Sequence, residues 1–122
     1  MTNKEKALAL INTFASGDTE KAKELLSPGY IQHNTAIADG LSGLGAALAA
    51  MAEQGIAMVY NKTHMVLADG DYGLACSEGT FGGVPTTYYD LFRVENGFIA
   101  EHWDVMETLA DKDTWQNQNG KF

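Results

Sequence analysis

The sequence predicts a single α+β domain in which three N-terminal helices cover one face of an antiparallel sheet. Two observations predict this class. Helical spacing of apolar residues is confined to the part before residue 55, and strand-like runs separated by short turns follow it. The chain has 122 residues, the size of one domain. We therefore expect one domain over 1–122, with 107–122 as a polar, peripheral tail.

Each helix follows from its own pattern. Between Ala7 and Phe14, apolar residues recur at i, i+3, i+4 and i+7, which is typical of an amphipathic helix. Asp18 can cap a short second helix that the Ser27-Pro28-Gly29 turn ends. Leucine and methionine residues between 41 and 51 mark a third helix.

Strand patterns occupy the rest of the chain. A short run at Tyr30–His33 alternates in polarity, and four longer runs follow the third helix. Their separators are short and rich in glycine, asparagine and aspartate, so consecutive strands should be antiparallel. A curved sheet with helices on its concave side leaves a pocket between the layers, a common position for ligand sites. The four runs are Met58–Ala68, Tyr72–Phe81, Thr86–Val94 and Phe98–Met106.

Composition excludes several classes of function. Eight basic against sixteen acidic residues give a net charge of −8, which disfavours nucleic acid and anionic membranes as partners. The single cysteine, Cys76, excludes an internal disulfide or a multi-thiolate zinc site, and we expect it to be a small buried residue. The chain shows no apolar run of about 20 residues and no signal-peptide pattern, so we expect a soluble cytoplasmic protein.

The last two strands carry the most informative side chains. Strand alternation places Asp90 on one face with Tyr88 and Phe92, and it places His102 with Asp104 on one face of the next strand. Two carboxylates and an imidazole among aromatic residues can perform general acid–base chemistry. A cross-strand histidine–aspartate pair can equally be a satisfied polar pair without further role.

The turn between these strands decides whether the two faces coincide. A two-residue Asn96-Gly97 turn would set Asp90 opposite Trp103. A three-residue loop over 95–97, with Gly97 as a bulge, would set Asp90 opposite His102. We favour the three-residue loop because the alternative would leave an unpaired carboxylate among apolar side chains.

The remaining polar residues give weaker signals. His33 ends the first strand and is either a hydrogen-bonded structural residue or part of the site, whereas His64 lies in a polar stretch and is expected on the surface. The three histidines show no H-x-H or H-x-x-x-H spacing, so the sequence predicts no metal.

Four segments together resemble the SnoaL-like polyketide cyclase family of the nuclear transport factor 2-like superfamily. The closing hairpin is the most specific part, and the resemblance extends from the first helix to about residue 107. It implies a cone-shaped α+β fold, which many different functions share. The segments are Tyr30–Asn34, the glycines and proline of 79–85, Tyr89–Gly97 and Ile99–Val105.

The resemblance also implies roles for individual residues. Asp104 matches the general acid/base of these cyclases, and Asp90 matches the strand position where ketosteroid isomerase keeps a protonated aspartate as an oxyanion donor. His33 matches a first-strand region that lines the pocket. In an enzyme of this kind, and apart from the resemblance, we expect His102 to tune or relay the proton of Asp104.

Two hypotheses follow. The first is a cofactor-free enzyme, an isomerase or a lyase of the polyketide cyclase type, that acts on a small carbonyl compound by aldol-type closure or isomerisation. The second is a non-catalytic small-ligand-binding or dimerisation module of the same fold. The predicted catalytic residues are Asp104, His102, Asp90 and His33, and the predicted substrate-binding residues are Tyr88, Phe92, Met106 and Phe14.

The superfamily commonly dimerises through the outer face of its sheet. In the favoured register Tyr89, Leu91 and Trp103 would form an apolar patch on that face. We therefore expect a homodimer.

Overall fold

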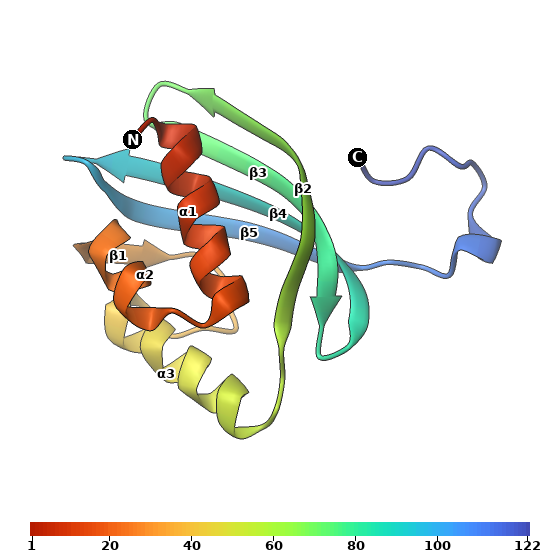
Figure 1. The fold of residues 1–122 in the computed structure, drawn as a ribbon, viewed down its shortest axis with the longest axis horizontal. Helices are drawn as coiled ribbons and strands as arrows, with labels where there is room; N and C mark the ends of the chain where they lie inside the picture. The colour runs from red at the N-terminus through yellow and green to blue at the C-terminus, as the bar shows by residue number, and fades with distance from the viewer.

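The computed structural model describes all residues 1–122 and confirms the α+β class (Figure 1). Three helices and five strands follow one another, with a single 3-10 turn near the C-terminus. The helices are α1 (Asn3–Ser16), α2 (Thr19–Leu25) and α3 (Gly40–Glu53); the strands are β1 (Leu26–Gln32), β2 (Met58–Asp69), β3 (Tyr72–Phe81), β4 (Val84–Glu95) and β5 (Phe98–Thr108); the turn is η1 (Lys112–Thr114).

Side-chain caps fix where each helix begins. The Thr2 hydroxyl accepts from the backbone N–H of Glu5 at the start of α1, and Asp18 accepts from the backbone N–H of Lys21 at 3.0 Å at the start of α2. Asp39 caps α3 with one carboxylate oxygen that also accepts from the backbone N–H of Gln32. The cap of α3 therefore also ties this helix to β1.

The five strands form one sheet in the order β1-β5-β4-β3-β2. All neighbours are antiparallel except β1, which runs parallel to β5 and places Gln32 beside His102. Figure 1 shows the long strands curving around the helices, with α1 lying across the concave face. No helix is both long and apolar enough to cross a membrane.

Irregular pairing between β2 and β3 contributes to the curvature. The register shifts twice along β2, first between Tyr60 and Lys62. Gly79 lies opposite Tyr60, and a Cβ atom there would stand 1.7 Å from the carbonyl oxygen of Val59. Only glycine permits this close approach of the two backbones, at the point where Tyr60 projects from the sheet.

The apolar core lies between α1, α2 and the concave face. Leu10, Ile11, Phe92 and Ile99 are at most 1% exposed and belong to one cluster of twelve buried residues. These are the apolar positions that helical and strand periodicity predict. Cys76 is buried, as expected.

The turn between β4 and β5 differs from the one that we favoured. Glu95 pairs with Phe98 across a two-residue turn in which Asn96 and Gly97 both have positive φ, 52° and 83°, as in a type I′ turn. The prediction of a three-residue loop is wrong. A register shift between Arg93 and Val94 then moves the partner strand by one residue. This bulge sets Asp90 opposite Asp104, and it returns Asp90, His102 and Asp104 to one face.

The C-terminal tail returns over the convex face of the sheet, on the side away from the helices (Figure 1). The Tyr89 hydroxyl donates to the backbone oxygen of Lys121, and the Lys121 ammonium pairs with Glu107 at 3.0 Å. The Phe122 ring stacks on His64 with centroids 4.1 Å apart. The tail is therefore peripheral but packed, and it covers part of the patch that we assigned to a dimer interface.

Candidate functional site

A cavity of about 480 Å³ lies between the concave face and helix α3. This volume falls within the range of small-molecule sites. Most of the wall is apolar, and the polar side chains, which form the polar end of the cavity, come from the strands and from Asn34 in the loop that follows β1. Its seventeen lining residues are Phe14, Gln32, Asn34, Ala36, Ile37, Leu44, Ala47, Leu48, Ala50, Met51, Met58, Tyr60, Phe81, Asp90, His102, Asp104 and Met106.

A buried histidine–carboxylate pair, His102 and Asp90, forms the centre of the polar end. Nε2 of His102 lies 2.9 Å from Oδ1 of Asp90, and the two side chains are 5% and 2% exposed. The Phe92 ring stacks beneath the imidazole at 4.7 Å with an interplanar angle of 14°. The pair is thus held rigidly and shielded from bulk water, which strengthens its electrostatic interaction.

Asp104 lies beside this pair and is bound differently. Its Oδ2 accepts from the side-chain amide of Asn34 at 3.0 Å, and its Oδ1 makes no hydrogen bond within the chain. The side-chain oxygen of Asn34 accepts from the backbone N–H of Ala36, which turns its NH₂ group toward Asp104. Asp104 is half-buried and keeps one oxygen available to a ligand in the cavity.

Two tyrosines adjoin the polar end: Tyr60 lines the cavity, and the buried Tyr30 hydroxyl accepts from the side-chain amide of Gln32. The Tyr60 hydroxyl donates to Oδ2 of Asp90 at 3.2 Å. Burial, reinforced by the charge of Asp90, raises the pKa of Tyr60 well above its ordinary value. The pKa of Tyr30 is raised too, with burial again the main cause. Both phenols therefore keep their protons and act as hydrogen-bond donors or acceptors at neutral pH.

The structure separates the four predicted substrate-binding residues into two layers. Phe14 and Met106 line the cavity. Tyr88 and Phe92 lie beneath it, at most 1% exposed. The Tyr88 hydroxyl donates to the backbone oxygen of Thr80 at 2.7 Å, its pKa is raised to about 12 by burial, and its ring packs on Tyr60. Tyr88 and Phe92 therefore pack beneath residues of the cavity and do not line it themselves.

His33 does not reach the cavity, contrary to its predicted role. Its side chain lies on the opposite side of β1, where Nε2 is 2.6 Å from Glu101 and the ring stacks on Trp103 at 4.6 Å. Strand alternation explains this position, because buried Tyr30 and Gln32 point inward and the residues between and after them point outward. His64, expected to be exposed, is half-buried against Glu78 and Phe122.

Sequence reasoning missed three polar residues of the site: Gln32, Asn34 and Tyr60. Alternation in β1 carried a usable signal for Gln32, since it shares the face of Tyr30. Asn34 and Tyr60 carried none, because their positions depend on the parallel pairing of β1 with β5 and on the bulged pairing of β2 with β3.

Asp90, His102 and Asp104 also form the group best arranged to hold a metal ion. Their nearest ligand atoms all lie within 4.8 Å of one another. Nε2 of His102 is however directed at Asp90, and Nδ1 lies 3.2 Å from Oε1 of Gln32. A metal would have to replace these hydrogen bonds, so the donor set fits a proton-sharing cluster better than a cation site.

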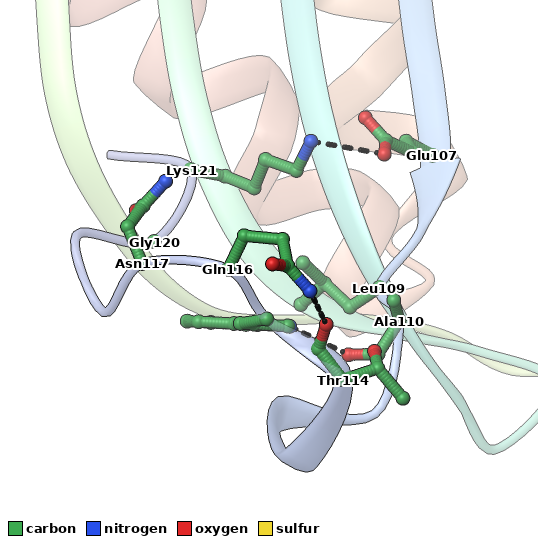
Figure 2. A pocket seen from close by; sticks show the side chains of 9 residues that line it. Glu107, Leu109, Ala110, Thr114, Gln116, Asn117, Gly120 and Lys121 are labelled. Carbon is green, nitrogen blue, oxygen red and sulfur yellow. Dashed lines mark hydrogen bonds and ion pairs between the residues drawn. The ribbon is translucent and has the colours of Figure 1, made fainter.

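Two other hollows carry less chemistry. An apolar groove of about 420 Å³ lies between α3 and the C-terminal end of α1. It shares Phe14, Leu48, Met51 and Met58 with the main cavity. A hollow of about 290 Å³ lies within the tail, where Figure 2 shows the Lys121–Glu107 ion pair across it. Its lining comes almost entirely from the tail, and it contains no histidine–carboxylate cluster.

Comparison with solved structures supports the fold. A protein of unknown function with a cystatin-like fold from Xanthomonas campestris is 26% identical, with a TM-score of 0.73 and coverage of 93% of this chain and 94% of that one. A proposed polyketide cyclase from Sinorhizobium meliloti is 20% identical, with a TM-score of 0.70 and coverage of 83% and 94%. IdmH from Streptomyces antibioticus, also a proposed polyketide cyclase, is 20% identical, with a TM-score of 0.66 and coverage of 88% and 93%.

No functionally curated protein matches the chain. The profile of the SnoaL-like domain, in contrast, matches residues 7–102. This stretch runs from within α1 through β4 to the first part of β5, and it includes Asp90 and His102. Because this match covers most of the chain, the chain belongs to the SnoaL-like domain family.

Proposed function

We propose that the protein is a cofactor-free acid–base enzyme that acts on a small carbonyl compound, by aldol-type cyclisation or by isomerisation. One observation carries the proposal. A carboxylate with an unpartnered oxygen, Asp104, lies beside the buried Asp90–His102 pair at the polar end of an otherwise apolar cavity. Such a cavity orients an apolar ligand body and places its polar end against the acid and the base.

Asp104 is the proposed base. Its Oδ1 takes a proton from a carbon next to the substrate carbonyl, and the electron pair of that C–H bond forms the enolate. The amide of Asn34 holds Oδ2 at 3.0 Å, which fixes the direction of the attacking oxygen. A base positioned in this way contributes about 10²–10⁴ in rate.

Asp90, His102 and Tyr60 are the proposed partners of the substrate oxygen. Negative charge develops on that oxygen as the enolate forms, and hydrogen-bond donors preorganised in a dry site stabilise it. Tyr60, Asp90 and His102 line the cavity together with Asp104. The hydroxyl of Tyr60 donates to Asp90 in the free protein, and it would turn this hydrogen bond toward the substrate oxygen as the enolate forms. His33 has no place in this mechanism, because it lies on the other face of the sheet.

The proposed reaction needs no reagent other than the substrate and the side chains of the protein. In an isomerisation, Asp104 returns its proton to a different carbon of the enolate. In an aldol closure, the enolate carbon forms a bond to a second carbonyl carbon, and the new alkoxide receives the proton from Asp104. Each route only rearranges bonds and protons of the substrate, so the proposed chemistry needs no cofactor.

Non-catalytic binding of a small ligand is the second candidate function. Twelve of the seventeen lining residues are hydrophobic, and such a lining binds an apolar molecule whether or not it reacts. The likeness to two proposed polyketide cyclases favours the enzyme, although at 20% identity that likeness is one of fold.

Hydrogen exchange distinguishes the two functions whatever the final product of the reaction is. The protein would be incubated in D₂O with a panel of small ketones and β-dicarbonyl compounds, and deuterium uptake at the carbon next to the carbonyl would be followed by NMR. We expect catalysed uptake with wild-type protein and a loss of about 100-fold or more for Asp104→Asn.

Asp113→Asn provides the matched control, since Asp113 is an exposed tail residue whose carboxylate makes no hydrogen bond within the chain. This variant should exchange at the wild-type rate. A folded Asp104→Asn variant with undiminished exchange would remove Asp104 from the mechanism. Tight binding of panel members without any exchange would favour the binding module.

A further inference from the structure

We propose that Gln32 is a positioning residue that sets the proton count of the Asp90–His102 pair. It holds the imidazole with a proton on Nδ1, so that one further proton lies between Nε2 and Asp90 and the pair has no net charge. The catalytic consequence rests on the proposed function, but the protonation pattern does not.

The orientation of the Gln32 amide follows from its partners. Its Oε1 lies 3.0 Å from the backbone nitrogen of Asn34. A backbone N–H can only donate, so the atom that it meets must be the amide oxygen. The Nε2 of Gln32 then donates to the hydroxyl of Tyr30 at 2.9 Å. The bond from the Asn34 backbone therefore fixes which end of the amide faces His102, and the Tyr30 hydroxyl, which can donate or accept, is compatible with this orientation.

The oriented amide decides the tautomer of His102. Nδ1 of the imidazole lies 3.2 Å from the same Oε1, in a buried position. The oxygen is an acceptor, so Nδ1 must carry a proton to form a hydrogen bond. An unprotonated Nδ1 would place two acceptors face to face away from water, which is unfavourable.

The other imidazole nitrogen then shares a proton with Asp90. Nε2 and Oδ1 are 2.9 Å apart, and a hydrogen bond between them needs one proton. Either imidazolium donates to carboxylate, or the acid of Asp90 donates to a neutral imidazole. The sum of the charges is zero in both forms. With the Gln32 amide reversed, Nδ1 would accept, Nε2–H would donate to carboxylate, and the pair would carry −1.

This difference matters where an enolate forms. The ionisable groups of the cavity surface are Asp104, Tyr60, Asp90 and His102, and no lysine or arginine lines it. A pair of charge −1 would repel the developing negative charge and would lack a transferable proton. A neutral pair avoids the repulsion and holds a proton that can move toward the substrate oxygen. Gln32 therefore acts on the reaction through His102.

Long-range ¹H–¹⁵N NMR of protein labelled with ¹⁵N-histidine measures the tautomer directly. We expect the His102 ring in the ligand-free wild type to show a protonated Nδ1 at neutral pH. Its Nε2 should be either protonated or hydrogen-bonded to an acidic proton. A spectrum with unprotonated Nδ1 and a simple Nε2–H would overturn the proposal. The outcome does not depend on turnover, so an inactive protein with protonated Nδ1 would defeat the proposed function alone.

Two variants test whether Gln32 is the cause. Gln32→Met keeps the length of the side chain but removes the acceptor, and His102 should lose the Nδ1 proton. Gln32→Glu keeps an acceptor for both Asn34 and His102, and it should retain the wild-type pattern. Gln118→Met, at an exposed position, is the control and should change nothing. A wild-type pattern in folded Gln32→Met, or its loss in Gln32→Glu, would contradict the assignment.

Discussion

All three histidines of the chain pair with a carboxylate, yet the two faces of the sheet use these pairs differently. On the concave face, His102 and Asp90 are 2.9 Å apart and at most 5% exposed. On the convex face, His33–Glu101 and His64–Glu78 have separations of 2.6 and 3.0 Å, but their histidine side chains are 40% and 24% exposed. Pair geometry therefore does not distinguish the candidate site.

Burial and access to the cavity make the difference. The convex pairs meet solvent, stack on Trp103 or Phe122, and stabilise the surface of the sheet. The concave pair is desolvated and lies beside Asp104 in a cavity that can exclude water from a ligand. Under the proposed function, burial and access to the cavity are what would give a histidine–carboxylate pair a chemical role, and sequence spacing alone does not reveal these surroundings.

Removal of the buried imidazole should produce the largest change in stability. His102→Phe leaves Asp90 buried with Tyr60 as its only remaining side-chain partner, and we expect a loss of about 3–5 kcal/mol in the free energy of unfolding. The matched convex variant, His33→Phe, keeps the stack on Trp103 and should lose about 1 kcal/mol or less. Urea unfolding of both variants measures the difference.

A second substitution sharpens this comparison. Adding Asp90→Leu to His102→Phe removes the stranded carboxylate, and it should recover much of the lost stability. Equal losses for the two single histidine variants would show that the buried pair is energetically no different from the exposed one.

The convex face should govern part of the acid sensitivity. The hydrogen bond from His33, followed by that from Arg93, lowers the pKa of Glu101 below its ordinary value of 4.5. A carboxyl group with a lowered pKa in the folded state stabilises the fold above its unfolded-state pKa. That contribution is lost as the pH falls through the folded-state value.

Glu101→Gln should therefore lower the Tm near neutral pH, and the deficit should shrink as the pH falls below the ordinary pKa of 4.5. Thermal unfolding followed by circular dichroism over this range tests the effect. A deficit that grows on acidification would contradict the assigned direction.

Self-association is the smallest expected effect of the convex face. The tail covers Tyr89, and His33 covers one side of Trp103, but Val105 remains 69% exposed. The homodimer stays a prediction. Light scattering at micromolar concentration should give twice the mass of the 13.2 kDa chain, and the monomer mass would contradict it.

Much of the fold was predictable from the sequence because helical and strand periodicity is local. The predicted run Tyr72–Phe81 coincides with β3, and Asp18 caps the second helix as its pattern predicts. The prediction that Asp90, His102 and Asp104 share one face is correct, although the three-residue loop from which it was made is not. A two-residue turn followed by a bulge restores the same side-chain parity as a three-residue loop.

The rest of the site depends on contacts between distant segments. Gln32 meets His102 because β1 runs parallel to β5, which local spacing does not specify. His33 was placed in the site by analogy to a region, whereas alternation from Tyr30 directs it outward. Tyr60 enters the cavity at a bulge that depends on Gly79 in the neighbouring strand.

A crystal structure with the carbonyl compound that exchanges fastest in D₂O would test most directly that chemistry belongs to the concave face. The compound should lie in the cavity beneath α3, with its reacting carbon against Oδ1 of Asp104 and its oxygen within hydrogen-bond distance of Tyr60 or Asp90. Density for the compound only in the tail hollow or against the convex histidines would contradict the assignment.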